Sequence, residues 1–310
     1  AVVQSAAPTS DGGTQDFTSS GFGTPICALF FGGYGTANGT VVNHAGLSVG
    51  FSDFTNHQAV TRAAEDTGGT SDTGSSAVGT AALQSLLTTD QTVDGTATAS
   101  TITDGARLTW SDAPPSAYLN AAVLFNTNAI SNCAVGSVAA STTIGATASA
   151  AGLGFQPDLI LAIMASGSGN ARTAIGMALN DGGIVQYAVG QDSNNGVGTT
   201  AVIGVVRNDR ITLNASGDAG VSLELTSFDA GGFTVTTRGS TAGSTMRYMA
   251  LKLATGVSAK LLTCTSPTST GSHSCTGSGF TPQAGIMLHS IVDTLNVYDA
   301  TAVNSEAFGV

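Results

Sequence analysis

Short apolar runs separated by small polar residues extend along the whole chain. The longest, such as residues 160–165 and 201–206, contain only a few residues, and Gly, Ser, Thr, Asn and Asp lie between them. Apolar runs of this length between such turn residues are typical of β-strands. Amphipathic helices instead need polar faces rich in Glu, Lys and Arg, and they contain few glycines. The pattern therefore predicts an all-β protein.

One segment occurs three times. It consists of a Gly-Phe pair, a proline two or three residues later, and then an apolar run. This order indicates a turn, a proline at the start of a strand and a strand buried on both faces. Within each copy a second strand is expected after the apolar run, at residues 44–53, 172–181 and, less clearly, 296–306. The landmark residues are Gly21, Phe22 and Pro25 in the first copy, Gly154, Phe155 and Pro157 in the second, and Gly279, Phe280 and Pro282 in the third.

Another landmark, an Asp and Gly turn followed by an alternating strand, occurs in the first two copies only. Asp104 and Asp229 begin these turns, and we interpret both as turn residues rather than catalytic carboxylates. Trp110 and Phe233 lie at inward positions of the strands that follow, so core packing is favoured over sugar stacking for Trp110. Closing strands are predicted at residues 118–125 and 248–253.

Each copy thus contains several short strands with turn signals about every 8–12 residues, as in antiparallel sandwiches and jelly rolls. We predict tandem β-sandwich domains at residues 1–128 and 129–256, and a partial third copy at 257–310. Half a sandwich cannot bury its inner face, so the third copy is expected to be completed by a neighbouring molecule or by sequence beyond residue 310.

Three stretches between the landmarks carry further expectations. Residues 66–80 and 190–200 are interpreted as exposed loops in equivalent places of the first two copies. Residues 134–152 are almost entirely Ala, Ser, Thr, Gly and Val and are expected to form an outer strand pair. Arg62 and Arg247 are expected to be exposed cations.

Composition narrows the possible partners. Only 9 % of the residues are charged and the formal net charge is −11, so no basic patch is available for nucleic acid, whose binding depends on Lys and Arg at the phosphates. The apolar runs are far shorter than the roughly 20 residues that a membrane helix needs. The sequence therefore indicates neither nucleic-acid binding nor membrane insertion.

The sequence contains no recognisable catalytic or metal-binding set. No G-x-S-x-G motif is present. The four histidines, His44, His57, His273 and His289, lack metal-ligand spacing. Cys264 and Cys275 are close enough in sequence to form a disulfide across a hairpin, and the alternative is two small buried apolar residues. We expect no catalytic residue, no metal ligand and no cofactor.

The landmarks together resemble a repeat of structural proteins of tailed bacteriophages. The resemblance rests on Gly154-Phe155-Gln156-Pro157-Asp158, the alternating strand 174–178, Ser227-Phe228-Asp229 with Gly232-Phe233-Thr234-Val235, and Tyr248-Met249-Ala250-Leu251. It is strongest in the second copy, because the first has Ile26 after its proline and the third contains only the first half.

This resemblance implies a non-enzymatic virion protein on the outer surface of the particle: a fibre, a tail appendage or a capsid decoration. Its implied partners are further copies of itself, other virion proteins and a host surface receptor or glycan. The alternative is an extracellular or cell-surface adhesin that binds carbohydrate through exposed aromatic residues, for which Tyr34, Tyr187 and Tyr298 are the candidates. An enzyme such as a depolymerase is the least favoured class.

Overall fold

The computed structural model describes residues 1–39, 45–65, 72–87, 92–166, 170–196, 202–213, 220–239, 244–266, 269–272, 274–290, 295–296 and 306–309. All regular elements within this part of the chain are β-strands, which confirms the all-β prediction. The first ten strands are β1 (Val2–Ala6), β2 (Thr14–Thr18), β3 (Cys27–Gly32), β4 (Ala45–Ser52), β5 (His57–Glu65), β6 (Asp72–Val78), β7 (Leu83–Leu86), β8 (Val93–Ile102), β9 (Gly105–Asp112) and β10 (Leu119–Phe125).

The next ten strands repeat this series. They are β11 (Ile130–Ala139), β12 (Thr147–Ala150), β13 (Leu159–Ser166), β14 (Asn170–Asn180), β15 (Ile184–Asn194), β16 (Val202–Arg207), β17 (Thr212–Leu213), β18 (Ser222–Asp229), β19 (Gly232–Gly239) and β20 (Thr245–Leu253). The C-terminal segment adds the pair β21 (Met287–Ser290) and β22 (Glu306–Gly309).

Strands β1 to β10 form one antiparallel sandwich, and β11 to β20 form a second with the same topology. In the first, a six-stranded sheet in the order β1-β10-β3-β4-β5-β6 faces a four-stranded sheet in the order β2-β9-β8-β7. In the second, the orders are β11-β20-β13-β14-β15-β16 and β12-β19-β18-β17. Adding ten to every strand number of the first sandwich gives the second. The predicted tandem of antiparallel sandwiches is therefore present.

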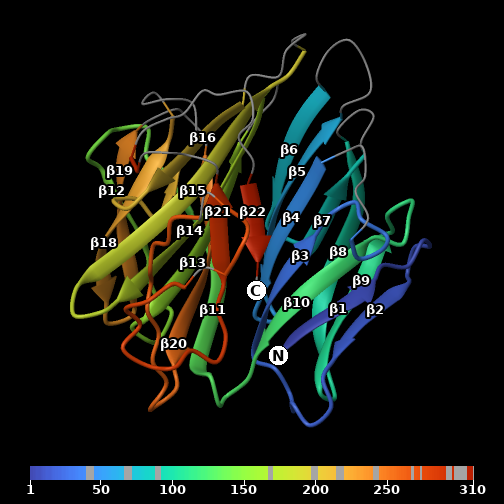
Figure 1. Ribbon diagram of the computed structural model, residues 1–310, viewed down its shortest axis with the longest axis horizontal. Coiled ribbons are helices and arrows are strands. Elements are labelled where there is room, and N and C mark those ends of the chain that lie inside the picture. Colours follow the sequence, from blue (N-terminus) through green and yellow to red (C-terminus); the bar gives the residue numbers. More distant parts are fainter. Residues whose placement is uncertain are drawn as a thin grey trace.

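The two six-stranded sheets, called the inner sheets below, pack against each other, so the molecule has four β-layers (Figure 1). In β3, Ala28 and Phe30 face the core of the first sandwich, whereas Cys27 and Leu29 face a core shared with the second. Both faces of such a strand need apolar side chains, which explains its continuous apolar sequence. The shared core contains, among others, Phe51, Val60, Ile163, Met249 and Leu251.

The Gly-Phe turns have the same backbone conformation in all three copies but different surroundings. Gly21, Gly154 and Gly279 have φ angles of 76°, 77° and 79°, a region that favours glycine. Pro25 and Pro157 are buried, and Phe22 and Phe155 pack against the cores of their own sandwiches. In the third copy, Phe280 is 38 % exposed and Pro282 is exposed.

The strand after the third Gly-Phe turn does not continue the pattern. Met287 is 69 % exposed, so the predicted burial on both faces is wrong for this copy. The physical reason is that β21 pairs with β22 and belongs to neither inner sheet, with Ile286 and Leu288 packed against the edge of the shared core. Most of the second strand predicted at 296–306 lies outside the described residues.

Two of the predicted loops are wrong over most of the residues that the structure describes, and only 79–80 and 195–196 are exposed bends as expected. Residues 72–78 form β6 at the edge of an inner sheet, and 190–194 form the buried end of β15. These two strands are not equivalent either, because β6 corresponds to β16. Residues 66–71 and 197–200 lie outside the described part. The strand pair predicted within 134–152 is also wrong, since β11 and β12 belong to different sheets.

Candidate functional site

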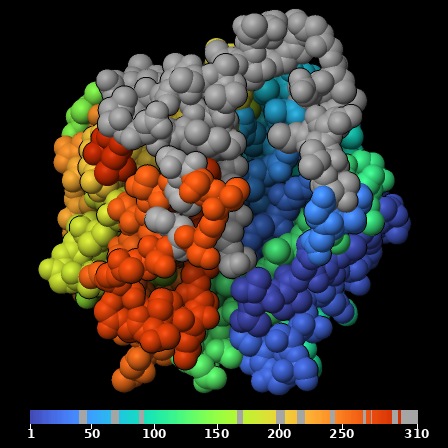
Figure 2. All heavy atoms as spheres, viewed as in Figure 1, coloured from blue at the N-terminus to red at the C-terminus, as the bar shows by residue number. Residues whose placement is uncertain are grey.

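The C-terminal segment, orange to red in Figure 2, covers one side of the second sandwich. Between them lies a groove with a volume of about 560 Å³. The end of β14, the end of β20 and the turn at Phe280 supply its walls. Its lining side chains include Asp158, Asp181, Lys252, Lys260 and Phe280. We treat this groove as the candidate functional site because it brings an exposed aromatic ring and two lysine–aspartate pairs into one hollow.

Asp158 organises the inner wall of the groove. Its Oδ1 atom lies 2.7 Å from Nζ of Lys252, and its Oδ2 atom accepts a hydrogen bond of 3.0 Å from the backbone N–H of Leu253. The backbone N–H of Asp158 donates to the carbonyl of Leu251, and its carbonyl accepts from Asn180. Asp158 therefore ties β13, β14 and β20 together. The sequence places it in the Gly-Phe-x-Pro-Asp landmark, but this role was not predicted.

The outer wall combines a second ion pair with an aromatic ring. Lys260 pairs with Asp181. Phe280 follows Gly279 in the turn, and its backbone carbonyl accepts a hydrogen bond of 2.6 Å from the Ser278 hydroxyl. An exposed ring beside hydroxyl, amide and paired charged groups is suited to holding a polar ligand of no net charge. The groove residues include no His or Cys, and both carboxylates are engaged by lysines.

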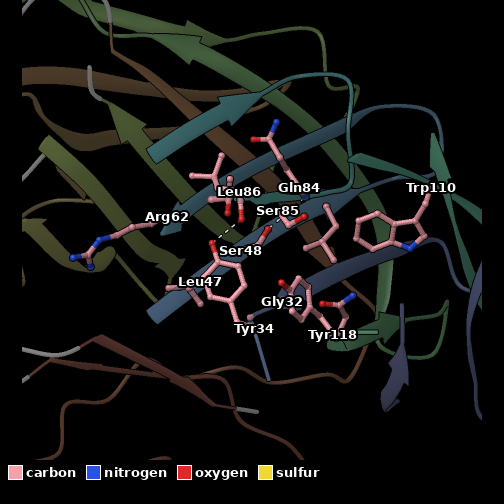
Figure 3. Close-up of a pocket in the computed structure, with 15 residues that line it drawn as sticks. Gly32, Tyr34, Leu47, Ser48, Arg62, Gln84, Ser85, Leu86, Trp110 and Tyr118 are labelled. Atoms are coloured by element: carbon pink, nitrogen blue, oxygen red, sulfur yellow. Dashed lines mark hydrogen bonds between the residues drawn. The ribbon is translucent and has the colours of Figure 1, made fainter. Parts of the chain in front are cut away.

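A smaller cavity of about 20 Å³ lies inside the first sandwich, next to Tyr34 and Trp110 (Figure 3). The Tyr34 hydroxyl donates to the carbonyl of Leu86 at 2.8 Å, and burial raises the pKa of Tyr34. Trp110 is 1 % exposed, and its Nε1–H donates to Gln15 Oε1 at 3.2 Å. A space of this size holds about one water molecule. Trp110 and Tyr34 are therefore core residues and not a sugar-binding platform.

Asp104 and Asp229 both have turn roles in the structure. The Asp104 carboxylate accepts hydrogen bonds from the N–H groups of Gly21 at 3.0 Å and Gly23 at 2.8 Å, which lower its pKa. In the second sandwich, Asp229 accepts a hydrogen bond of 2.8 Å from the Thr234 hydroxyl, and Gln156 donates to the carbonyl of Phe228. In each sandwich the Gly-Phe turn is thus hydrogen-bonded to the turn that contains Asp and Gly.

The remaining candidates are scattered. Cys264 and Cys275 form a disulfide with a Cα–Cα distance of 5.7 Å. Phe233 is fully buried against Tyr248. Tyr187 is half-buried and His289 is exposed, whereas His44, His273 and Tyr298 lie outside the described residues. His57 is half-buried, with Nδ1 2.9 Å from the Ser52 hydroxyl. No group of three or more His, Cys, Asp or Glu side chains suited to a metal ion occurs in the described part of the chain.

Two arginines connect the sandwiches, so the prediction of exposed cations is wrong for both. Arg62 on β5 donates to the side chains of Gln191 and Ser193 on β15. Arg247 on β20 donates to the carbonyl of Val78 at 3.1 Å. These contacts between the sandwiches were not predicted, although an arginine between Thr61 and Ala63 in a strand of small residues is a signal for a buried polar partner.

Between the two residues that Arg62 contacts lies Asp192, which is 3 % exposed and accepts a hydrogen bond of 3.0 Å from Arg172. Burial raises the pKa of Asp192, and Arg172 only partly offsets this effect. Thr73 on β6 also reaches across, its N–H donating to the Asn195 side chain at 3.0 Å. Polar contacts therefore fix the register of the two inner sheets where the shared apolar core ends.

Comparison with family models, curated proteins and solved structures gives no match. The described residues also include no helix long and apolar enough to cross a membrane.

Proposed function

We propose that the chain is a non-enzymatic structural protein on the outer surface of a tailed-bacteriophage virion, as a fibre, tail appendage or capsid decoration. The observation that carries this proposal is the fusion of two identical topologies through a shared apolar core. Close-packed interiors resist deformation. A four-layer body of this kind is suited to bearing load and presenting its edges to neighbours, including further copies of itself and other virion proteins.

The landmark residues support the same proposal. A catalytic or sugar-binding site would need its carboxylates and its aromatic ring to face an open cleft. Asp104 and Asp229 are instead hydrogen-bonded in turns, and Trp110 is buried in the core. The C-terminal segment instead exposes large apolar side chains: Val257, Leu262, Phe280, Met287 and Leu295 are all at least 37 % exposed. These side chains provide apolar surface for a contact with a neighbouring protein.

Immunogold electron microscopy of phage particles from the source, with an antibody against residues 130–253, tests this proposal. Regular label on heads, tails or fibres is the expected result and identifies the location. Particles that carry the chain's peptides in mass spectrometry and are labelled only after disruption would place the protein inside the virion. Absence of both label and peptides would exclude a virion role.

A second candidate is a carbohydrate-binding adhesin, which the groove favours. Its exposed Phe280 ring lies beside Asn180, Ser258 and two lysine–aspartate pairs, and sugars bind by stacking on a ring while polar groups meet their hydroxyls. We expect Phe280→Ala to reduce binding on a glycan array by about tenfold, the loss of about 1.4 kcal/mol. Ile144→Ala is the matched control, because Ile144 is 64 % exposed and does not line the groove. Equal binding by both variants, or none by the unmodified chain, would exclude this candidate.

A further inference from the structure

Two cysteines that are 106 positions apart in sequence meet at the interface between the sandwiches. Cys27 opens β3 and is completely buried in the shared core, and Cys133 on β11 packs against the same core. Neither belongs to the Cys264–Cys275 disulfide.

The strand register explains how the two cysteines come together. Cys133 lies opposite Leu251 on β20, and Val135, two residues along the same face, lies opposite Met249. The Cys27 Sγ atom is 4.0 Å from the Met249 Sδ atom. Met249 and Leu251 lie two positions apart on the same face of β20, so Cys27 packs one side-chain position along this strand from the residue that lies opposite Cys133.

The two thiols have different environments. The pKa of the Cys27 thiol is raised well above its ordinary value, first by burial and then by the neighbouring Cys133 thiol. Cys133 lies on an edge strand and is partly exposed. An oxidant from solution therefore reaches Cys133 first, because Cys133 is partly exposed whereas Cys27 is buried.

We propose that Cys27 and Cys133 form a second disulfide, which joins the two sandwiches covalently. A low-molecular-weight disulfide such as oxidised glutathione supplies the oxidising equivalents. The Cys133 thiolate attacks one glutathione sulfur and releases a first glutathione thiolate, which leaves a mixed disulfide on Cys133. The Cys27 sulfur attacks the Cys133 sulfur, and its proton passes to the departing sulfur of the second glutathione, which leaves as a thiol. Two protein thiols are oxidised and one disulfide is reduced to two thiols.

Trypsin provides a direct test, because the positions of Lys and Arg put the cysteines in three separate peptides. Cys27 lies in peptide 1–62, Cys133 in peptide 108–172, and Cys264 with Cys275 in peptide 261–310. The full chain is incubated with oxidised glutathione, denatured, blocked with N-ethylmaleimide and digested. We expect peptides 1–62 and 108–172 to be joined before reduction and separate after it.

Three outcomes would overturn the proposal: both peptides carrying N-ethylmaleimide, Cys133 stopping at the glutathione adduct, or either peptide joined to 261–310. Cys133→Ser is the control, since it leaves buried Cys27 unchanged and must abolish the linked peptide. A bond that closes so long a loop should raise Tm by about 10 °C in the unmodified chain and not in Cys133→Ser. These outcomes are independent of whether the protein belongs to a virion.

Discussion

At the scale of single residues, His57 provides the clearest pH-dependent contribution to stability. Burial lowers the pKa of its imidazole, and the nearby Asp53 charge only partly offsets that effect. Below the ordinary pKa of about 6.5, the unfolded chain binds a proton at this site more readily than the folded chain does. His57 therefore does not reduce the free energy of unfolding above about pH 6.5, and it reduces this free energy increasingly as the pH falls below that value.

We accordingly expect the free energy of unfolding to decrease more steeply between pH 7.5 and pH 5.5 in the unmodified chain than in His57→Gln. Guanidinium unfolding at the two pH values measures both slopes. Asp192 has a raised pKa and acts in the opposite direction, since its folded form takes up a proton first. Because Asp192 is present in both proteins, its contribution cancels in the comparison. Identical slopes would show that His57 does not contribute.

At the scale of elements, one glycine in each sandwich permits the two sheets to approach. A Cβ atom at Gly50 on β4 would lie 1.8 Å from the Ala82 carbonyl oxygen. A Cβ atom at Gly176 on β14 would lie 1.8 Å from the Ile211 carbonyl oxygen. Ala82 and Ile211 immediately precede β7 and β17, and these two strands are equivalent in the topology. The repeat thus conserves a backbone contact as well as a strand order.

We expect Gly176→Ala to destabilise the protein by about 3 kcal/mol, because the backbone of the facing sheet has to move. Gly183→Ala is the matched control: it lies in the adjacent turn with open space around its Cβ position. The control should change stability by less than about 1 kcal/mol. Urea unfolding followed by circular dichroism measures both, and equal effects would contradict the proposed steric role.

The elements also show what the sequence could and could not predict. The landmarks made of a Gly-Phe pair and a proline located β3 and β13, because a turn glycine, a proline and an apolar run are all local signals. Strands β6 and the end of β15 were missed because their Ser, Thr, Gly and Asp residues also favour turns. Their strand structure depends on partners far away in sequence, such as Arg62 for Ser193.

The groove was not predictable for a related reason. Asp158 and Lys260 are unremarkable in sequence, and they line one hollow only because the C-terminal segment folds back over the second sandwich. The four-layer arrangement was equally hidden, although its signature was present. Strands 27–32 and 159–166 are apolar on both faces, which requires a layer on each side. A single sandwich supplies only one of these layers.

At the scale of the whole molecule, the shared core predicts that the two sandwiches unfold together. The only tryptophan, Trp110, lies in the first sandwich, so its fluorescence reports on that half alone, whereas far-ultraviolet circular dichroism reports on both. Gly176→Ala acts in the second sandwich. Because separating the halves would expose Leu29, Phe51 and Met249 to water, the first sandwich cannot keep its stability once the second unfolds.

We therefore expect Gly176→Ala to lower the midpoint of the Trp110 transition by the same amount as the circular dichroism midpoint. A destabilisation of about 3 kcal/mol leaves a protein of ordinary stability folded, so both transitions remain measurable. Gly183→Ala should leave both midpoints in place. If the Trp110 midpoint stayed at its original value while circular dichroism showed an earlier transition, the sandwiches would be independent units. The shared core would then be an ordinary interface between them and not part of one cooperative fold.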